Sequence, residues 1–482
     1  MKKRDALSLF LVIFLILLMI MDSALILPNE VLIAADLNVY FDAIGLLIGI
    51  YTVFHGISIL TFGYFTDKIE RKKLLIFSGF LWSITVMLYL FIEEFWQLMI
   101  GRIVAAIAVG VTAPLVISFL ADIISSESRS KSFAFWGLLS TFAGFFAGFF
   151  ALAFNTIDYT AIEALSTPPE KISYIIVNYS DLLNTWRIPY FILGWLALAF
   201  TLLNVFLTKE PKRAATEKYF KDLLIQENLQ YSYKIKISDL KFIVKRKSNI
   251  FLILNFFDVI ASGLLVGFIF PYIQFDIQIN FIDIRVIILL LIVGVFGLFI
   301  GQFGLAHWGD KKVQKGDLAG RVKVAVICSI LTLPFLLFAF AMSPNIPSQS
   351  FFFQGLTVDI IGFWILWIIY CSFLGVGLAF TMGIGPNWYA SMIDVNFPEN
   401  RGTMVAIASF VDTIGRAIGV IIGGFVFTIT GSFSSTIFWS TLIFGLISIG
   451  FWLPLFVTAK KDFNNVNEEM KKRALLIQEE KS

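Results

Sequence analysis

Six ionisable side chains interrupt segments that are otherwise apolar, namely Asp22, His55, Arg102, Asp258, Asp412 and Arg416. At bilayer depth each such group costs about 2.5–3.5 kcal/mol on insertion scales, which makes all six candidates for function. A desolvated carboxylate such as Asp22 or Asp258 can exchange a proton near neutral pH. Arg102 is the expected partner of Asp22, and protonation of that carboxylate would free the guanidinium for an anionic group. The alternative is a static buried ion pair.

The other ionisable groups leave their roles open. Asp412 and Arg416 are one helical turn apart, so they share a face and can neutralise each other. Such a pair fits a structural role as well as it fits a contact with substrate. His55 either lines a cavity or hydrogen-bonds a neighbouring helix. The sequence has two histidines and no HExxH, GxSxG or phosphate-binding loop, so it predicts neither an enzyme nor a metal or cofactor site.

The elements that position these residues follow from composition. The 482-residue chain is 58% hydrophobic and 15% charged, whereas soluble globular proteins carry roughly 25% charged residues. A helix needs about 20 apolar residues to cross a bilayer. Twelve segments qualify, at 7–28, 43–66, 73–92, 95–122, 130–154, 186–208, 249–272, 286–309, 322–342, 360–393, 402–429 and 433–457. The chain is therefore predicted to be an all-α polytopic membrane protein.

The distribution of basic residues predicts the orientation. With the N-terminus in the cytoplasm, 32 of the 37 Lys and Arg residues fall in loops and tails on that side. Because cytoplasmic loops carry the excess of basic residues, we expect a multi-pass cell-membrane protein with both termini cytoplasmic. The net charge of +3 gives no reason to expect nucleic acid as a partner.

An internal repeat divides the chain in two. PLVISFLADIISSESR at 114–129 and PNWYASMIDVNFPENR at 386–401 share Pro, Asp, Glu and Arg at a constant offset of 272 residues. Asp122 and Arg129 thereby match Asp394 and Arg401. We expect two pseudo-symmetric six-helix bundles at 1–208 and 249–458, a cytoplasmic linker with an amphipathic surface helix at 209–248, and a cytoplasmic tail at 459–482.

The hinge GYFTDKIERKK at 63–73 carries a resemblance to a known family. It resembles the loop 2–3 signature of the major facilitator superfamily, with Gly63, Asp67, Lys68, Arg71 and Lys72 at matching positions and Glu70 where the family usually has glycine. Arg102 matches the family's helix 4 arginine. Asp22, the Leu-Pro pair at 27–28, the Asp-Leu pair at 36–37 and Gly45 resemble, more loosely, the spinster-like branch, whose members carry lysolipids or sphingoid lipids.

The resemblance implies a gate and a cavity. The Asp67 carboxylate should reach the N-terminal end of the helix that begins near Arg401, where free amides and the helix dipole favour an anion. Arg71 should pair with Asp122. The implied cytoplasmic gate comprises Gly63, Asp67, Arg71, Asp122, Arg129, Asp310, Asp394 and Arg401. The alternative is that the hinge charges only fix the topology. Asp22 and Asp258 lie on helices that line the family's central cavity.

These observations together predict a function. We expect a monomeric secondary active transporter that moves a small organic solute, anionic or amphiphilic, by alternating access coupled to protons. The alternatives are a spinster-like lysolipid transporter and a transporter-like receptor or scaffold without transport. The helix 5 segment lacks the proline of the family's drug antiporters, which argues against drug antiport. Four-residue glycine spacings at Gly144–Gly148 and Gly415–Gly419–Gly423 predict sliding contacts between the two halves.

Overall fold

The computed structural model describes residues 3–39, 41–155, 168–213, 241, 243, 245–272, 284–342, 351–353, 356–358 and 360–479. Within these residues, twelve helical segments are long and apolar enough to cross a membrane. They are Ala6–Leu25, Ala43–Lys68, Arg71–Phe91, Phe95–Ile123, Ser126–Leu152, Arg187–Leu207, Lys247–Leu265, Ile292–Gln314, Gly320–Met342, Trp364–Asp394, Pro398–Phe427 and Phe433–Trp452. The twelve spans predicted from the sequence are confirmed.

The first six spans form the first bundle. Its α-helices are α1 (Lys3–Ile20), α2 (Asp22–Leu25), α3 (Glu30–Asp36), α4 (Phe41–Lys68), α5 (Arg71–Leu88), α6 (Phe95–Val109), α7 (Thr112–Ile123), α8 (Arg129–Leu152), α10 (Pro168–Asn178) and α11 (Arg187–Leu207). Short 3₁₀ turns connect some of them: η1 (Leu27–Asn29), η2 (Tyr89–Phe91) and η3 (Ser126–Ser128).

The last six spans form the second bundle. Its α-helices are α14 (Lys247–Ile253), α15 (Phe256–Pro271), α16 (Ile284–Phe299), α17 (Ala306–Gln314), α18 (Gly320–Met342), α19 (Ile360–Asp394), α20 (Arg401–Thr430) and α21 (Phe433–Trp452). A π-helical turn, η6 (Ile300–Leu305), joins α16 to α17, and a 3₁₀ turn, η7 (Pro398–Asn400), precedes α20. The strands β1 (Phe351–Phe353) and β2 (Leu356–Val358) form a small antiparallel hairpin.

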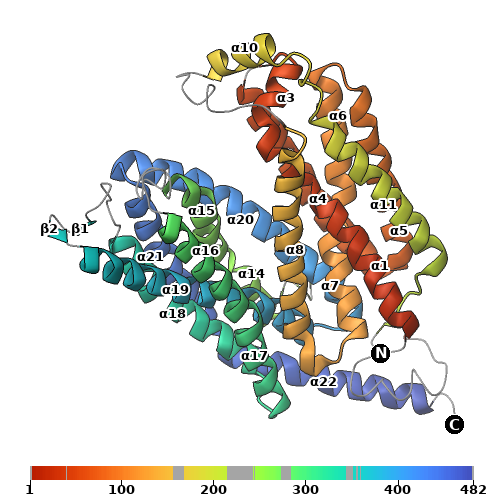
Figure 1. Cartoon of the computed structure of the whole chain (residues 1–482). Helices are drawn as coiled ribbons and strands as arrows, with labels where there is room; N and C mark the ends of the chain where they lie inside the picture. The colour runs from red at the N-terminus through yellow and green to blue at the C-terminus, as the bar shows by residue number, and fades with distance from the viewer. Residues whose placement is uncertain are drawn as a thin grey trace.

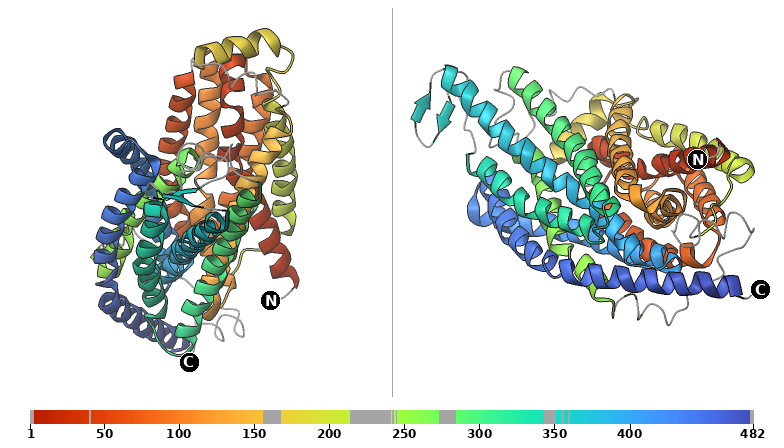
Figure 2. Two further views of the ribbon diagram at one scale, coloured as in Figure 1. Left: turned by 60° about the vertical axis from the view of Figure 1, so that its left-hand side comes forward. Right: turned by 90° about the horizontal axis from the view of Figure 1, so that it is seen from below.

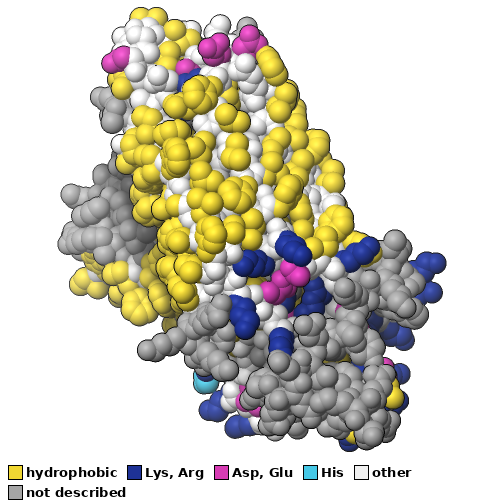
Figure 3. Space-filling view, turned by 90° about the vertical axis from the view of Figure 1, so that its right-hand side faces the viewer, with side chains coloured by type: hydrophobic (Ala, Val, Ile, Leu, Met, Phe, Trp, Pro, Cys, Tyr) yellow, Lys and Arg dark blue, Asp and Glu magenta, His cyan; other side chains and the backbone are white. Residues whose placement is uncertain are grey.

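Both chain ends lie on one face of the molecule, here called the termini face (Figure 1). The two bundles meet near this face and diverge toward the opposite end. The C-terminal helix α22 (Leu455–Glu479) runs along the termini face, as the view from below shows (Figure 2). A broad apolar zone covers the first bundle between charged ends, as expected for a surface in lipid (Figure 3).

Several spans are discontinuous rather than straight helices. The first is interrupted at Met21, immediately before Asp22, and the fourth between Val109 and Thr112. The seventh is interrupted at Leu254 and Asn255, between α14 and α15. Membrane helices tolerate such breaks where surrounding protein satisfies the freed backbone groups. Asp22 and Asp258 thus both lie in the first turn of a helix that follows a break.

Two expectations about helix packing and the linker have different outcomes. The glycine rows do not form contacts between the bundles. A Cβ atom added to Gly144 or Gly148 would have no neighbouring atom within 4 Å, and Gly419 and Gly423 pack against α15 of their own bundle. This prediction was wrong because small residues also permit close packing inside one bundle. Most of the predicted linker helix at 209–248 lies outside the described residues.

Candidate functional site

The first candidate group is an ion pair inside the first bundle. Arg102 of α6 donates from Nη1 to Oδ2 of Asp22, in the first turn of α2, over 2.6 Å. Both side chains are buried, with 1% and 0% of their surface exposed. The sequence placed them on separate helices, and the fold brings them into contact because α2 follows the break at Met21.

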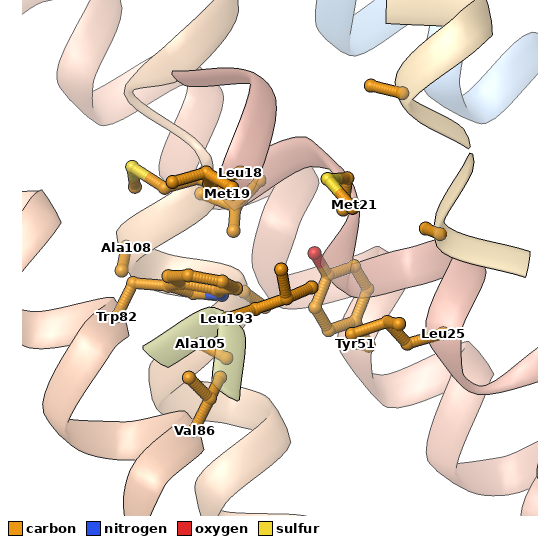
Figure 4. Packing of buried hydrophobic residues seen from close by; sticks show 14 of the residues in the cluster. Leu18, Met19, Met21, Leu25, Tyr51, Trp82, Val86, Ala105, Ala108 and Leu193 are labelled. Carbon is orange, nitrogen blue, oxygen red and sulfur yellow. The ribbon is translucent and has the colours of Figure 1, made fainter. Parts of the chain in front are cut away.

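Tyrosine rings enclose the Arg102 guanidinium. It lies 4.1 Å from the centroid of the Tyr51 ring, an arrangement typical of cation–π contact. Tyr51 is labelled beside Met21 and Leu25 within the buried cluster of the first bundle (Figure 4). His55 stacks on Tyr51, with ring centroids 5.8 Å apart, and is itself partly exposed. Tyr51 therefore contacts both the buried Arg102 and the partly exposed His55.

The Asp22–Arg102 pair makes a single contact rather than a two-pronged one. Oδ1 of Asp22 and Nε of Arg102 are both buried without a hydrogen-bond partner among the described residues. A static structural pair gains most from the bidentate geometry that a guanidinium and a carboxylate allow. Unsatisfied buried polar atoms are costly and call for an explanation. The observed geometry is therefore not the one that best stabilises a purely structural pair.

The second bundle holds the other membrane-depth groups. Arg416 donates from Nε to Asp412 over 3.0 Å, so these neighbours on α20 form the predicted intrahelical pair. The Arg416 side chain is 52% exposed. Asp258 lies instead in a pocket whose walls come from α15, α18, α19 and α21 of the second bundle. Asp258 therefore does not join the Asp22–Arg102 pair.

At the termini face, the Asp67 carboxylate at the end of α4 caps the N-terminus of α20. It accepts hydrogen bonds from the backbone amides of Gly402 and Thr403 over 2.9 and 2.6 Å, and from the Thr403 hydroxyl over 2.7 Å. Free amides and the helix dipole make a helix N-terminus a favourable site for an anion. The acidic hinge residue thus ties the first bundle to the second.

Two glycines allow this contact to form. A Cβ atom on Gly63 would lie 1.9 Å from Cβ of Ala406, and one on Gly402 would lie 2.3 Å from the Thr66 hydroxyl. Both distances are shorter than any real Cβ contact, so a side chain at either position would push α4 and α20 apart.

Basic residues hold the hinge beneath this cap. Arg71 donates to Asp122 over 2.8 Å and to Glu210 over 3.2 Å. Arg213 donates to the backbone carbonyls of Thr66, Asp67 and Ile69. Desolvation on burial, together with the Arg71 charge, lowers the pKa of Arg213. The carbonyls at the end of α4 replace part of the water that this guanidinium loses.

A second cap mirrors the first. Asp310 of α17 accepts hydrogen bonds from the backbone amides of Ser130 and Lys131, at the N-terminus of α8, over 3.1 and 3.0 Å. Asp310 also pairs with Arg321 over 2.7 Å. A carboxylate of each bundle therefore caps a helix of the other, as pseudo-symmetry requires.

Asp394 joins the two sides of this second cap. It pairs with Arg129 of the first bundle over 3.0 Å and also with Arg321 of its own bundle. Asp122 and Asp394 each lie at the end of a helix that is followed by a 3₁₀ turn, and Arg129 and Arg401 each begin the next helix. Arg401 is buried and donates from Nε to the carbonyl of Ile393 over 3.3 Å.

Two buried or partly buried arginines of this face, Arg321 and Arg213, were not predicted from the sequence. Arg321 stands at the start of α18 as Arg71 stands at the start of α5, and each pairs with the carboxylate that ends a later helix. This correspondence was the available signal. Arg213 had none, because its contacts depend on where the chain after α11 returns to the hinge.

The family model of the Major Facilitator Superfamily matches residues 12–382, which is most of the chain. The chain belongs to the Major Facilitator Superfamily. The membership predicted from the hinge is confirmed, and the chain is a multi-pass membrane protein of that superfamily.

Two curated relatives of this facilitator-superfamily chain match it in part. It is 29% identical over 161 residues to the uncharacterized transporter BU466 of Buchnera aphidicola, covering 29% of this chain and 41% of that protein. It is 21% identical over 214 residues to the quinolone resistance protein NorA of Staphylococcus aureus, covering 44% and 48%. The chain spans less than half the length of these curated relatives.

Solved structures match the chain over nearly its whole length. The fucose:proton symporter FucP of E. coli superposes with a TM-score of 0.63 at 15% identity, covering 96% of this chain and 99% of that one. A bacterial homologue of the human lysosomal transporter Spinster, in an inward-facing conformation, gives 0.50 at 15% identity over 96% and 99%. These likenesses show the shared fold, and their equal identities do not single out the spinster-like branch.

The two bundles separate on the side of the caps that lies away from the termini face. Gly137 of α8 still approaches Gln302 of η6. Beyond this level an apolar groove of about 380 Å³ separates α8 from α16. It is lined by Leu138, Thr141, Phe142, Phe145, Phe146, Phe149, Val295, Leu298 and Phe299. The structure is therefore closed at the termini face and parted toward the opposite end.

Proposed function

We propose that this protein is a proton-coupled secondary transporter of a small organic solute, working by alternating access between two transport domains at 1–208 and 249–458. The buried, singly bonded Asp22–Arg102 pair is the observation that carries the proposal. It combines an acid able to take up a proton with a cation able to bind solute. We propose that the chain acts as a monomer.

The termini face is the cytoplasmic face in this proposal. The distribution of Lys and Arg supports that orientation. The conformation described above is then outward-open, with the caps at Asp67 and Asp310 closing the cytoplasmic side. Opening toward the cytoplasm requires both caps to break, since each joins one bundle to the other.

Coupling follows from the chemistry of the pair. A proton added at Oδ1 of Asp22 removes the negative charge that holds Arg102. The guanidinium is then free to bind an anionic or zwitterionic solute, and release of the proton on the other side restores the ion pair. A ligand shifts a conformational equilibrium only by its differential affinity for the two states. The exchange of Arg102 between carboxylate and solute supplies that difference.

The solute class follows from the same exchange. Arg102 favours a carboxylate or phosphate group, because a guanidinium binds such groups in a bidentate manner. The likeness to FucP, named a proton symporter, supports coupling to protons and does not extend to its sugar. The likeness to NorA does not lead us to propose drug export, since the α8 segment lacks the proline of drug antiporters.

Transport in proteoliposomes tests the proposal. Purified protein is reconstituted with a pH-sensitive dye inside, and radiolabelled organic anions, zwitterions, neutral sugars and lysolipids are added with and without an imposed pH gradient. The proposal expects accumulation of an acidic or zwitterionic solute that requires the gradient, with a matching change in the internal pH.

Two outcomes would contradict it. Uptake that stops when the solute concentrations inside and outside the vesicle are equal, with or without the pH gradient, would indicate a facilitator. Binding of a ligand by the purified protein without uptake of that ligand would favour a receptor with a transporter fold.

A further inference from the structure

An unpaired carboxylate lies in the second bundle. Asp258 stands in the first turn of α15, directly after the break at Leu254 and Asn255. Its side chain has no hydrogen bond and no ion pair within 4 Å among the described residues. The nearby cation, Arg416, is already bonded to Asp412 over 3.0 Å. Asp258 is only partly exposed, and a carboxylate inside a membrane span with no counter-charge in contact is costly, so a partner for it is expected.

Hydroxyl groups surround this carboxylate. The pocket around Asp258 is formed by α15, α18, α19 and α21, and its polar lining consists of Asp258, Ser262, Ser329, Thr332, Thr381 and Thr441. Its other walls are Ala261, Leu265, Leu333, Leu336 and Gly445, so no basic side chain is among the described residues that line it. The lining thus offers oxygen atoms and one negative charge.

Two polar atoms near this carboxylate are left without partners. Serine and threonine hydroxyls in the same lining bond to their own helix: Ser262 donates to the carbonyl of Val259 and Thr381 to that of Gly377, both over 3.0 Å. Ser329 lines the pocket with 5% of its surface exposed, and its Oγ has no partner. Oδ1 of Asn255, one turn before Asp258, is also buried without one. Such atoms in a native structure call for an explanation, and a bound ion or water is one.

The size of the pocket limits the ligand. Its volume of about 30 Å³ is enough for one or two water-sized particles and excludes an organic solute. Hard cations prefer carboxylate, carbonyl and hydroxyl oxygens, and divalent ions usually take more than one carboxylate. Discontinuous transmembrane helices hold sodium ions in other transporter folds.

We propose that this pocket binds one sodium ion, held by the Asp258 carboxylate and the hydroxyls of Ser329 and its neighbours. The ion supplies the missing counter-charge and joins α15 to α18 across the break in the seventh span. All the walls belong to the second bundle, so the site is separate from Asp22 and Arg102. The inference does not rest on the proposed function, because an ion can be bound whether or not the chain moves a solute with protons.

Sodium binding to the purified full-length chain tests the proposal. Thermal unfolding is followed by tryptophan fluorescence while NaCl replaces choline chloride at constant ionic strength, and binding of ²²Na⁺ is measured by scintillation proximity. We expect a saturable rise in Tm with sodium, because a ligand that binds only the folded state stabilises it. We expect one bound ion per chain, and no such rise with potassium.

Variants identify the site. Asp258→Asn and Ser329→Ala should each weaken sodium binding by about tenfold or more, since each removes a ligand oxygen or its charge. Asp181→Asn and Ser372→Ala change exposed residues of the same types and should leave the sodium dependence unchanged. The dependence on sodium is compared rather than the Tm itself, so a variant of altered stability still gives a result.

Three results would overturn the proposal. Equal effects of sodium, potassium and choline would exclude a specific site, and ²²Na⁺ binding that persists in Asp258→Asn would place the ion elsewhere. A Tm that rises as the pH falls, with no competition from sodium, would show that a proton neutralises Asp258.

Discussion

Asp67 accepts hydrogen bonds from both the backbone amide and the hydroxyl of Thr403, a residue 336 positions later in the chain. The contact joins the end of α4 to the start of α20, and Asp310 makes the equivalent contact with the start of α8. Together with the Asp394–Arg129 pair, these two caps hold the bundles together at the termini face. Because the caps lie on opposite sides of the pseudo-symmetry axis, loss of one leaves the other in place.

Asp67→Asn should shift the protein toward the state that is open at the termini face. Asparagine lacks the charge and has one acceptor oxygen, so it cannot satisfy all three donors of Gly402 and Thr403. A hydrogen bond to a charged group contributes about 1.5–3 kcal/mol, so the equilibrium should move about tenfold or more. Double electron–electron resonance between spin labels at the exposed residues Lys68 and Lys461 would then show a longer distance between the two labels.

Lys73→Gln is the matched control for this substitution. Lys73 lies in the same hinge, but its side chain is 69% exposed and pairs only with Glu70 in the contacts described. Exposed pairs of this kind contribute about 0–1 kcal/mol, so the label distances should not change. An unchanged distance distribution in Asp67→Asn itself would reduce the hinge to a topological signal.

Arg321→Lys should weaken the second cap although it preserves the charge. Arg321 contacts Asp310, Asp394 and the Ser130 hydroxyl at once, and the fixed fork of its donors suits two carboxylates in a way that an ammonium group does not. We expect a lower Tm and a partial opening of the termini face. Lys323→Met, which removes a half-exposed lysine two residues later, should have little effect. A lysine variant as stable as the parent would mean that charge alone is required.

Arg473→Glu should also favour opening, through the C-terminal helix. Arg473 of α22 pairs with Glu399 over 2.7 Å and lies 4.5 Å from the Phe397 ring, just before the capped N-terminus of α20. Breaking a fully buried pair costs about 3–5 kcal/mol, and the effect should be smaller here because Arg473 is 14% exposed. The distance between spin labels at Lys68 and Lys461 measures this opening.

Exchanging the two charges tests whether the Arg473–Glu399 pair itself, and not the charge of the C-terminal helix in general, controls opening. The double variant Glu399→Arg with Arg473→Glu should recover part of the parent distance, whereas Lys472→Glu, on the exposed face of the same helix, should not change it. If the double variant were as open as the single one, the contact between α22 and η7 would have no part in gating.

The sequence was sufficient for those features that depend on local pattern or on the cost of charge in lipid. Apolar length predicted the twelve spans. The energetic need to neutralise charge at bilayer depth predicted that Asp22 would meet Arg102. The Asp67 cap followed from the family resemblance together with the anion preference of a helix N-terminus.

Other features depend on tertiary packing and had no local signal. The one signal for Arg321 was its place in the repeat, and the rule that basic residues gather in loops on one side of the membrane explained it without a partner. The breaks at Met21 and Leu254 contain neither glycine nor proline, the residues that usually mark them. The glycine rows of α8 and α20 share one spacing but differ in surroundings, which the spacing cannot reveal.

Asp22→Asn should abolish accumulation driven by a pH gradient while leaving counterflow exchange partly intact. Asparagine cannot exchange a proton, so Arg102 loses its switchable partner, yet the amide still fills the space beside Tyr51. Exchange of labelled for unlabelled solute needs no net proton movement and should continue. Arg102→Ala should instead remove binding of an anionic solute altogether. Asp181→Asn, an exposed acidic residue, serves as the control for both assays. If Asp22→Asn accumulates solute as the parent does, the proton is carried by another group and the buried pair is structural.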